Sequence, residues 1–175
     1  MRLFIIFLLT FSYTLNAQEY ANYKVDKAYA IEIHNKARKK VKVNKLEWSD
    51  ELAKQAQYYA DYLAETNKGL FHSKNLTFLN QGENLYMEIG FRVNYYDEFR
   101  WFGIASGAWL SEKKLFKRKF SKFSPNSKHY KAGHYTQMVW KNTRQFGMGV
   151  SKINNKVYVV ARYFPAGNWI GKHIY

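Results

Sequence analysis

Helical periodicity fills the first two thirds of this chain and strand patterns close it, and this order restricts the available folds. Apolar residues recur at helical spacing in 25–41, 49–69 and 96–117. Alternating or β-branched runs appear only later, at 146–151 and 157–164. Because strands do not alternate with helices, a doubly wound βαβ fold is excluded, and we predict a single domain of the α+β class.

Local signals define several element ends. Ser49 followed by two acidic residues is typical of a helix N-terminus, and Asn67 with Gly69 is typical of a C-terminus. Asn154 and Asn155 separate the two strand runs, which predicts a hairpin. In the third helix an apolar face also carries one carboxylate, and a buried carboxylate needs a partner. The residues of that face are Phe102, Ala105, Trp109, Phe116 and the acidic Glu112.

The first 17 residues resemble a secretory signal peptide. Arg2 precedes an apolar run, and Ala17 precedes polar residues, so we expect cleavage there, a secreted protein and a mature domain over 18–175. The run is too short for a membrane span, and a buried N-terminal helix is the alternative. The chain has no cysteine, which excludes disulfides, thiol nucleophiles and thiolate metal sites. Stability must therefore come from packing and hydrogen bonds.

A formal net charge of +15 indicates anionic partners. The basic residues gather between Glu112 and His134, where no acidic residue lies and phenylalanines are interleaved. We assign anionic-surface binding to Lys113, Lys114, Lys117, Arg118, Lys119 and Lys122, with Lys128 and Lys131 beyond them. This pattern suits an anionic membrane surface or a sulfated glycan, and a solvated loop is the alternative. No nucleic-acid-binding motif accompanies it, which argues against nucleic acid.

Two long strings resemble the signatures of the CAP superfamily, the cysteine-rich secretory, antigen 5 and pathogenesis-related 1 proteins. They are GHYTQMVW over 133–140 and YVVARYFPAGN over 158–168. Shorter matches occur in the expected order at Gly82-Glu83-Asn84-Leu85, at Trp109 with Glu112, and at His34-Asn35 with Arg38. The sequences of these motifs are similar to those of the Golgi-associated pathogenesis-related branch of the family, although that branch lacks a signal peptide. The resemblance covers about residues 25–170.

The resemblance implies a three-layer α-β-α sandwich with a cleft that gathers two histidines and two glutamates. Residue by residue these are His72, Glu83, Glu112 and His134. By sequence alone each is an ordinary surface or capping residue, and only Glu112 stands out. Two imidazoles can bind Zn²⁺ or another divalent cation while the carboxylates orient them, so His72 and His134 are the expected metal ligands. A hydrogen-bonded network without metal is equally consistent with these residue types.

The family resemblance favours a binding protein over an enzyme, and sterol or lipid is the ligand class that it implies. A metal-assisted hydrolase, protease or esterase, is the first alternative, and a receptor-directed signalling or toxin-like protein is the second. No catalytic residue is assigned, because H-E-x-x-H and G-x-S-x-G patterns are absent. Ile89 stands where a serine has been suggested to act in the Golgi-associated branch. Asn75 is the only candidate for N-glycosylation, in the sequon Asn75-Leu76-Thr77.

Overall fold

The computed structural model describes residues 2–90, 100–116, 122–124 and 131–175, with side chains from residue 21 onward. Helices and strands follow one another as α1 (Arg2–Lys40), β1 (Glu47–Trp48), α2 (Asp50–Thr66), β2 (Gly82–Ile89), α3 (Trp101–Ser111), the 3-10 helix η1 (Glu112–Leu115), α4 (Gly133–Met138), β3 (Gln145–Ile153) and β4 (Lys156–Phe164).

The four strands form one mixed sheet in the order β1-β3-β4-β2. β3 and β4 are the predicted antiparallel hairpin, and Asn154 adopts the left-handed conformation in its turn, with φ of 53°. β2 runs antiparallel to β4, and the register places Glu83 opposite Arg162. β1 pairs with β3 in parallel over two residues. In this order β1 and β2 are the two edge strands of the sheet.

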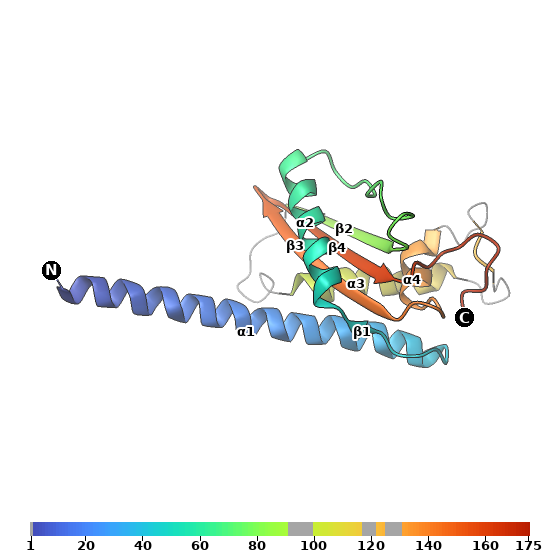
Figure 1. Ribbon diagram of the computed structural model, residues 1–175, viewed down its shortest axis with the longest axis horizontal. Coiled ribbons are helices and arrows are strands. Elements are labelled where there is room, and N and C mark those ends of the chain that lie inside the picture. Colours follow the sequence, from blue (N-terminus) through green and yellow to red (C-terminus); the bar gives the residue numbers. More distant parts are fainter. Residues whose placement is uncertain (1, 91–99, 117–121, 125–130) are drawn as a thin grey trace.

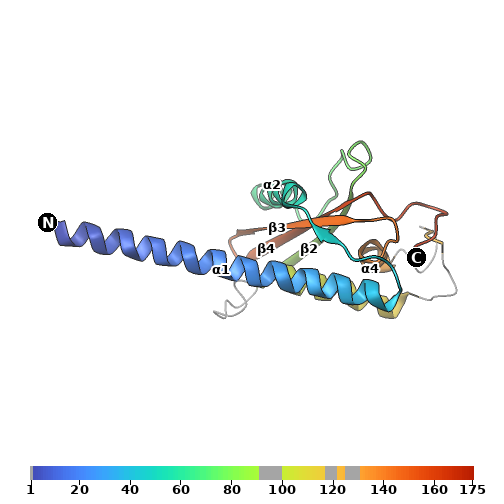
Figure 2. The same ribbon diagram turned by 60° about the horizontal axis from the view of Figure 1, so that its bottom comes forward.

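Helices cover both faces of this sheet. α2 packs on one face, against β3 and β4, while α1, α3 and α4 lie on the other (Figure 1). The turned view separates the layers, with α2 above the strands and α1 below them (Figure 2). This arrangement is the α+β, three-layer sandwich that the sequence predicts. The larger buried cluster lies between the sheet and α1, α3 and α4, and a smaller one lies under α2.

α2 begins and ends where its capping residues predict. The Ser49 hydroxyl accepts a hydrogen bond from Leu52 N at 3.2 Å, and Asn67 closes the helix in the left-handed conformation with φ of 50°. Its apolar stripe is buried against the sheet. The buried side chains of that stripe include Leu52, Ala56, Tyr59, Ala60 and Leu63.

The predicted helix over 96–117 is longer than the helix observed. α3 ends at Ser111, and Glu112 lies in the 3-10 helix η1 that follows it. The tighter turn breaks the helical face on which Glu112 was expected, although Phe102, Ala105 and Trp109 are buried as predicted. Residues 96–99 and 117 lie outside the described part of the chain.

α1 contains residues 25–40 of the helix predicted over 25–41, and it continues back to Arg2. The side chains of the predicted signal peptide, residues 1–17, lie outside the described part. Within the described residues, no helix is both long enough and apolar enough to cross a bilayer.

Candidate functional site

His72 and Glu83 form one hydrogen-bonded pair. His72 Nδ1 lies 2.7 Å from Glu83 Oε1, which also accepts from Ser73 N at 3.2 Å. The Glu83 side chain is fully buried, whereas the His72 side chain is 59% exposed. The loop that carries His72 lies against α2, because Tyr59 donates its hydroxyl to Phe71 O at 2.9 Å.

Arg162 compensates the buried charge of Glu83. Its Nη2 lies 3.2 Å from Glu83 Oε2, and its guanidinium stacks 5.1 Å above the centre of the Tyr59 ring. Burial lowers the pKa of Arg162, and the neighbouring Glu83 opposes that effect. The two oxygens of the buried Glu83 carboxylate thus have different partners. Oε1 bonds to His72, and Oε2 is paired with the Arg162 guanidinium, which compensates the buried charge.

His134 and Glu112 form the second pair. His134 Nδ1 lies 2.6 Å from Glu112 Oε1. The other carboxylate oxygen accepts from His134 N at 3.0 Å and from Tyr135 N at 3.3 Å, so Glu112 also holds the start of α4. The Trp109 ring packs 6.1 Å from the imidazole, and the His134 side chain is 36% exposed. Glu112, the carboxylate that was expected to need a partner, therefore faces three nitrogen atoms, one in the His134 ring and two in the backbone.

Two consecutive residues of β2 join these pairs. Neighbouring side chains of a strand point to opposite faces, so Glu83 reaches His72 on the α2 face while Asn84 reaches the other face. There Asn84 Nδ2 donates to His134 O at 3.1 Å and to the Tyr163 hydroxyl at 3.1 Å. The structure thus places both pairs beside the edge strand. The sequence assigned Asn84, Arg162 and Tyr163 no role at the site; only their place in the motif strings drew attention to them.

The two pairs orient the imidazoles in the same way. A carboxylate only accepts hydrogen bonds, so each Nδ1 is the donor, and a ring without a second proton has its lone pair on Nε2. Within the described residues, however, no group of three histidine, aspartate or glutamate side chains is arranged to hold a metal ion. Each pair thus offers one imidazole nitrogen that could serve as a metal ligand.

The other predicted site residues are dispersed. Lys113, Lys114 and Lys122 are exposed, whereas Lys117, Arg118 and Lys119 lie outside the described residues. Asn75 is exposed in the turn before β2, and its Oδ1 accepts from the Ser73 hydroxyl at 2.8 Å. Ile89 is at the end of β2 and 54% exposed.

Comparison with known proteins assigns the fold and the motifs to one family. The family model described as "CAP: Cysteine-rich secretory protein family" matches residues 31–164, more than half of the chain. The chain belongs to the CAP family. Two relatives are 34% identical to this CAP protein: tobacco (Nicotiana tabacum) pathogenesis-related protein 1C over 146 residues, and human Golgi-associated plant pathogenesis-related protein 1 over 147. The matches cover 83% and 81% of this chain, and 78% and 84% of the relatives.

A solved structure of the CAP fold is also similar. The structure described as "Crystal structure of NaASP2 with Zn2+" superimposes with a TM-score of 0.70 and 27% sequence identity, over 85% of this chain and 83% of the other. The agreement shows that the two proteins share one fold over most of both chains.

Proposed function

We propose that this CAP protein is a binding protein that holds a divalent cation such as Zn²⁺ through His72 and His134. The observation that carries the proposal is the pairing of each Nδ1 with a glutamate, which directs both free lone pairs to the Nε2 atoms. The similarity to a protein crystallised with Zn²⁺ supports it. A bound ion would supply positive charge and exchangeable water positions for an oxygen-bearing ligand.

Zinc titration by calorimetry tests this proposal. We expect the His72→Ala, His134→Ala double variant to lose binding, and Glu112→Gln to weaken it by roughly tenfold or more, because the amide orients the ring less strongly. Binding should also weaken on acidification, since protons compete for the same lone pairs. His173→Ala is the matched control, because His173 is exposed and belongs to neither pair.

Unchanged affinity in the double variant would place the ion elsewhere. An equal loss in His173→Ala would show a nonspecific histidine effect. Circular dichroism of every variant separates loss of a ligand from loss of the fold.

We further propose secretion with removal of residues 1–17, and attraction of the exposed lysines around η1 to anionic lipid surfaces. N-terminal sequencing of protein recovered from the medium should begin at Gln18, and a chain still starting at Met1 would contradict this.

Sterol binding, metal-assisted hydrolysis and receptor-directed signalling stay predictions of the family resemblance, and no contact among the described residues favours one of them.

A further inference from the structure

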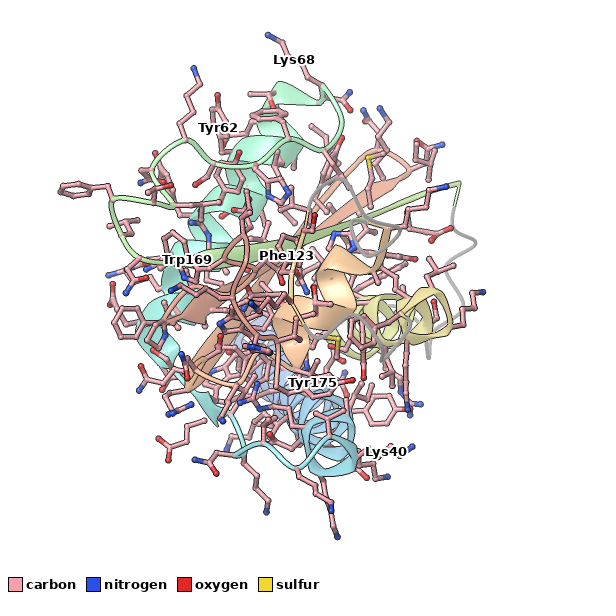
Figure 3. The ribbon with its side chains drawn as sticks, turned by 90° about the vertical axis from the view of Figure 1, so that its right-hand side faces the viewer. Lys40, Tyr62, Lys68, Phe123, Trp169 and Tyr175 are labelled. Carbon is pink, nitrogen blue, oxygen red and sulfur yellow. The ribbon has the colours of Figure 1, made fainter. Side chains whose placement is uncertain are left out.

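A hollow lies between the segment that follows α4 and the C-terminal segment. Its volume is about 610 Å³, within the range of small-ligand sites. Figure 3 labels Trp169, Phe123 and Tyr175 on this side of the molecule, where the C-terminal segment crosses the surface. None of the residues of the two histidine–glutamate pairs lines the hollow. The lining residues are Trp140, Lys141, Asn142, Trp169, Lys172 and His173.

Trp169 forms a fixed aromatic wall of this pocket. It is 47% exposed, yet its indole N–H donates to Ala166 O at 3.1 Å, which restrains the ring. Lys172 N donates to Trp169 O at 3.1 Å, and the preceding Asn168 is bonded to Gly133 O at 2.8 Å. An exposed tryptophan that is already oriented loses little entropy when a ligand stacks on it.

The walls around Trp169 are basic. Lys141, Lys172 and His173 line the pocket together with the Asn142 amide, and no acidic side chain is among the lining residues. The backbone at both lysines is hydrogen-bonded, since Lys141 N donates to Ile174 O at 2.7 Å and Lys172 N donates to Trp169 O at 3.1 Å. In the sequence every acidic residue precedes Lys113, so no acidic side chain elsewhere in the C-terminal third offsets these charges.

We propose that this pocket binds an acidic saccharide. The indole face offers a surface for the C–H face of a sugar ring, the amide can bond hydroxyls, and the cationic groups match sulfate or carboxylate. Single-stranded nucleic acid fits this pocket less well. Proteins that bind single strands stack successive bases on several exposed aromatic rings. The second aromatic ring of this pocket, Trp140, is only 2% exposed. The proposal is independent of the metal site, since the two share no residue.

Calorimetric titration with a heparin-derived hexasaccharide tests the proposal, with neutral maltohexaose as the uncharged ligand. We expect Trp169→Ala to weaken binding of the sulfated ligand roughly tenfold. Charge reversal with Lys141→Glu and Lys172→Glu should weaken it by a similar or larger factor. The matched control, Lys39→Glu with Lys45→Glu, makes the same charge change at exposed positions on α1 and the loop after it, and should stay within about twofold.

Three results would overturn this assignment. The first is equal weakening by both charge reversals with no effect of Trp169→Ala, which would indicate nonspecific attraction. The second is equally tight binding of maltohexaose. The third is tighter binding of a single-stranded oligonucleotide through the same residues. Because zinc is absent from the titration, failure here leaves the metal proposal unaffected, and melting curves of each variant confirm that the fold is retained.

Discussion

At the scale of single residues, His34 shows how a buried polar group is satisfied. Its side chain is fully buried, with Nδ1 donating to Ala30 O at 2.8 Å and Nε2 accepting from the Tyr163 hydroxyl at 2.9 Å. Both ring nitrogens of His34 thus have a hydrogen-bond partner. Tyr163 in turn accepts from Asn84, so a chain of hydrogen bonds runs from α1 to the strand that joins the two histidine pairs.

Two buried groups should make stability depend on pH with opposite signs. Burial lowers the pKa of His34 to about 4, so protonation favours the unfolded chain, and stability is lost as pH falls from about 6.5 to 4. Burial raises the pKa of Asp26 to about 6, so its protonated form favours the fold, and stability is lost as pH rises from about 4 to 6. Each full effect is on the order of 3 kcal/mol.

Urea unfolding between pH 4 and pH 7 separates these effects. His34→Gln removes the first titration while leaving a donor and an acceptor, so its stability should rise on acidification through the contribution of Asp26. Asp26→Asn should instead become less stable on acidification. Curves for both variants that run parallel to the parent protein would contradict this.

Individual residues also join elements. The buried Arg38 guanidinium donates from Nη1 to Met138 O and Trp140 O and from Nη2 to Thr143 O, at 2.9 to 3.0 Å. These bonds tie the end of α1 to the segment after α4. The charge has several carbonyl dipoles as partners in place of a carboxylate, so its burial is compensated by hydrogen bonds.

At the scale of elements, the contact between α2 and β3 depends on two glycines. A Cβ at Gly147 would lie 2.2 Å from Ala53 N, and one at Gly149 would lie 2.2 Å from Gln57 N. Both neighbours are backbone atoms of α2, which cannot yield without moving the helix. The alternation of Gly147 and Gly149 along β3 therefore sets how closely α2 approaches the sheet.

We expect Gly149→Ala to lower the free energy of unfolding by about 3 kcal/mol, because the helix must shift away from the strand. Gly107→Ala is the matched control, since Gly107 is exposed in α3 and a Cβ there meets nothing within 4 Å. That variant should gain up to about 1 kcal/mol from helix propensity. Chemical denaturation measures both, and equal changes would refute the packing argument.

At the scale of the whole molecule, the net charge of +15 favours anionic surfaces. The described phenylalanines of the basic segment face inward. Phe116 packs 5.8 Å from the rings of Tyr135 and Tyr175, and Phe123 is 7% exposed and packs on Trp140. Phe123 therefore belongs to the core, and its ring is not available for insertion into lipid. Phe120 lies outside the described residues.

Vesicle binding should therefore depend on charge. We expect co-sedimentation with acidic vesicles at low salt and its loss near 1 M salt, where the Debye length is about 3 Å. Lys113→Glu, Lys114→Glu and Lys122→Glu together should weaken it more than the control set Lys39→Glu, Lys42→Glu and Lys45→Glu. Equal binding to neutral vesicles, or a remainder that resists salt, would contradict this expectation.

The sequence by itself determined the features that depend on neighbouring residues. Ser49 and Asn67 mark the ends of α2 because capping involves groups within a few positions. Asn154 and Asn155 predict the β3-β4 turn for the same reason. The motif strings identified the family and, through it, His72, Glu83, Glu112 and His134.

The tertiary structure alone decided the features that depend on distant residues. β2 was not predicted as a strand, because it pairs with β4 residues that lie 67 to 81 positions further along the chain. The end of α3 before Glu112 reflects the hydrogen bonds that this carboxylate makes to His134 and Tyr135, which no local periodicity records. Only the sheet order shows that Glu83 and Asn84 lie in an edge strand, where one reaches His72 and the other His134. The residue types indicated histidine–carboxylate hydrogen bonding, but which residues lie together depends on pairing between distant parts of the chain.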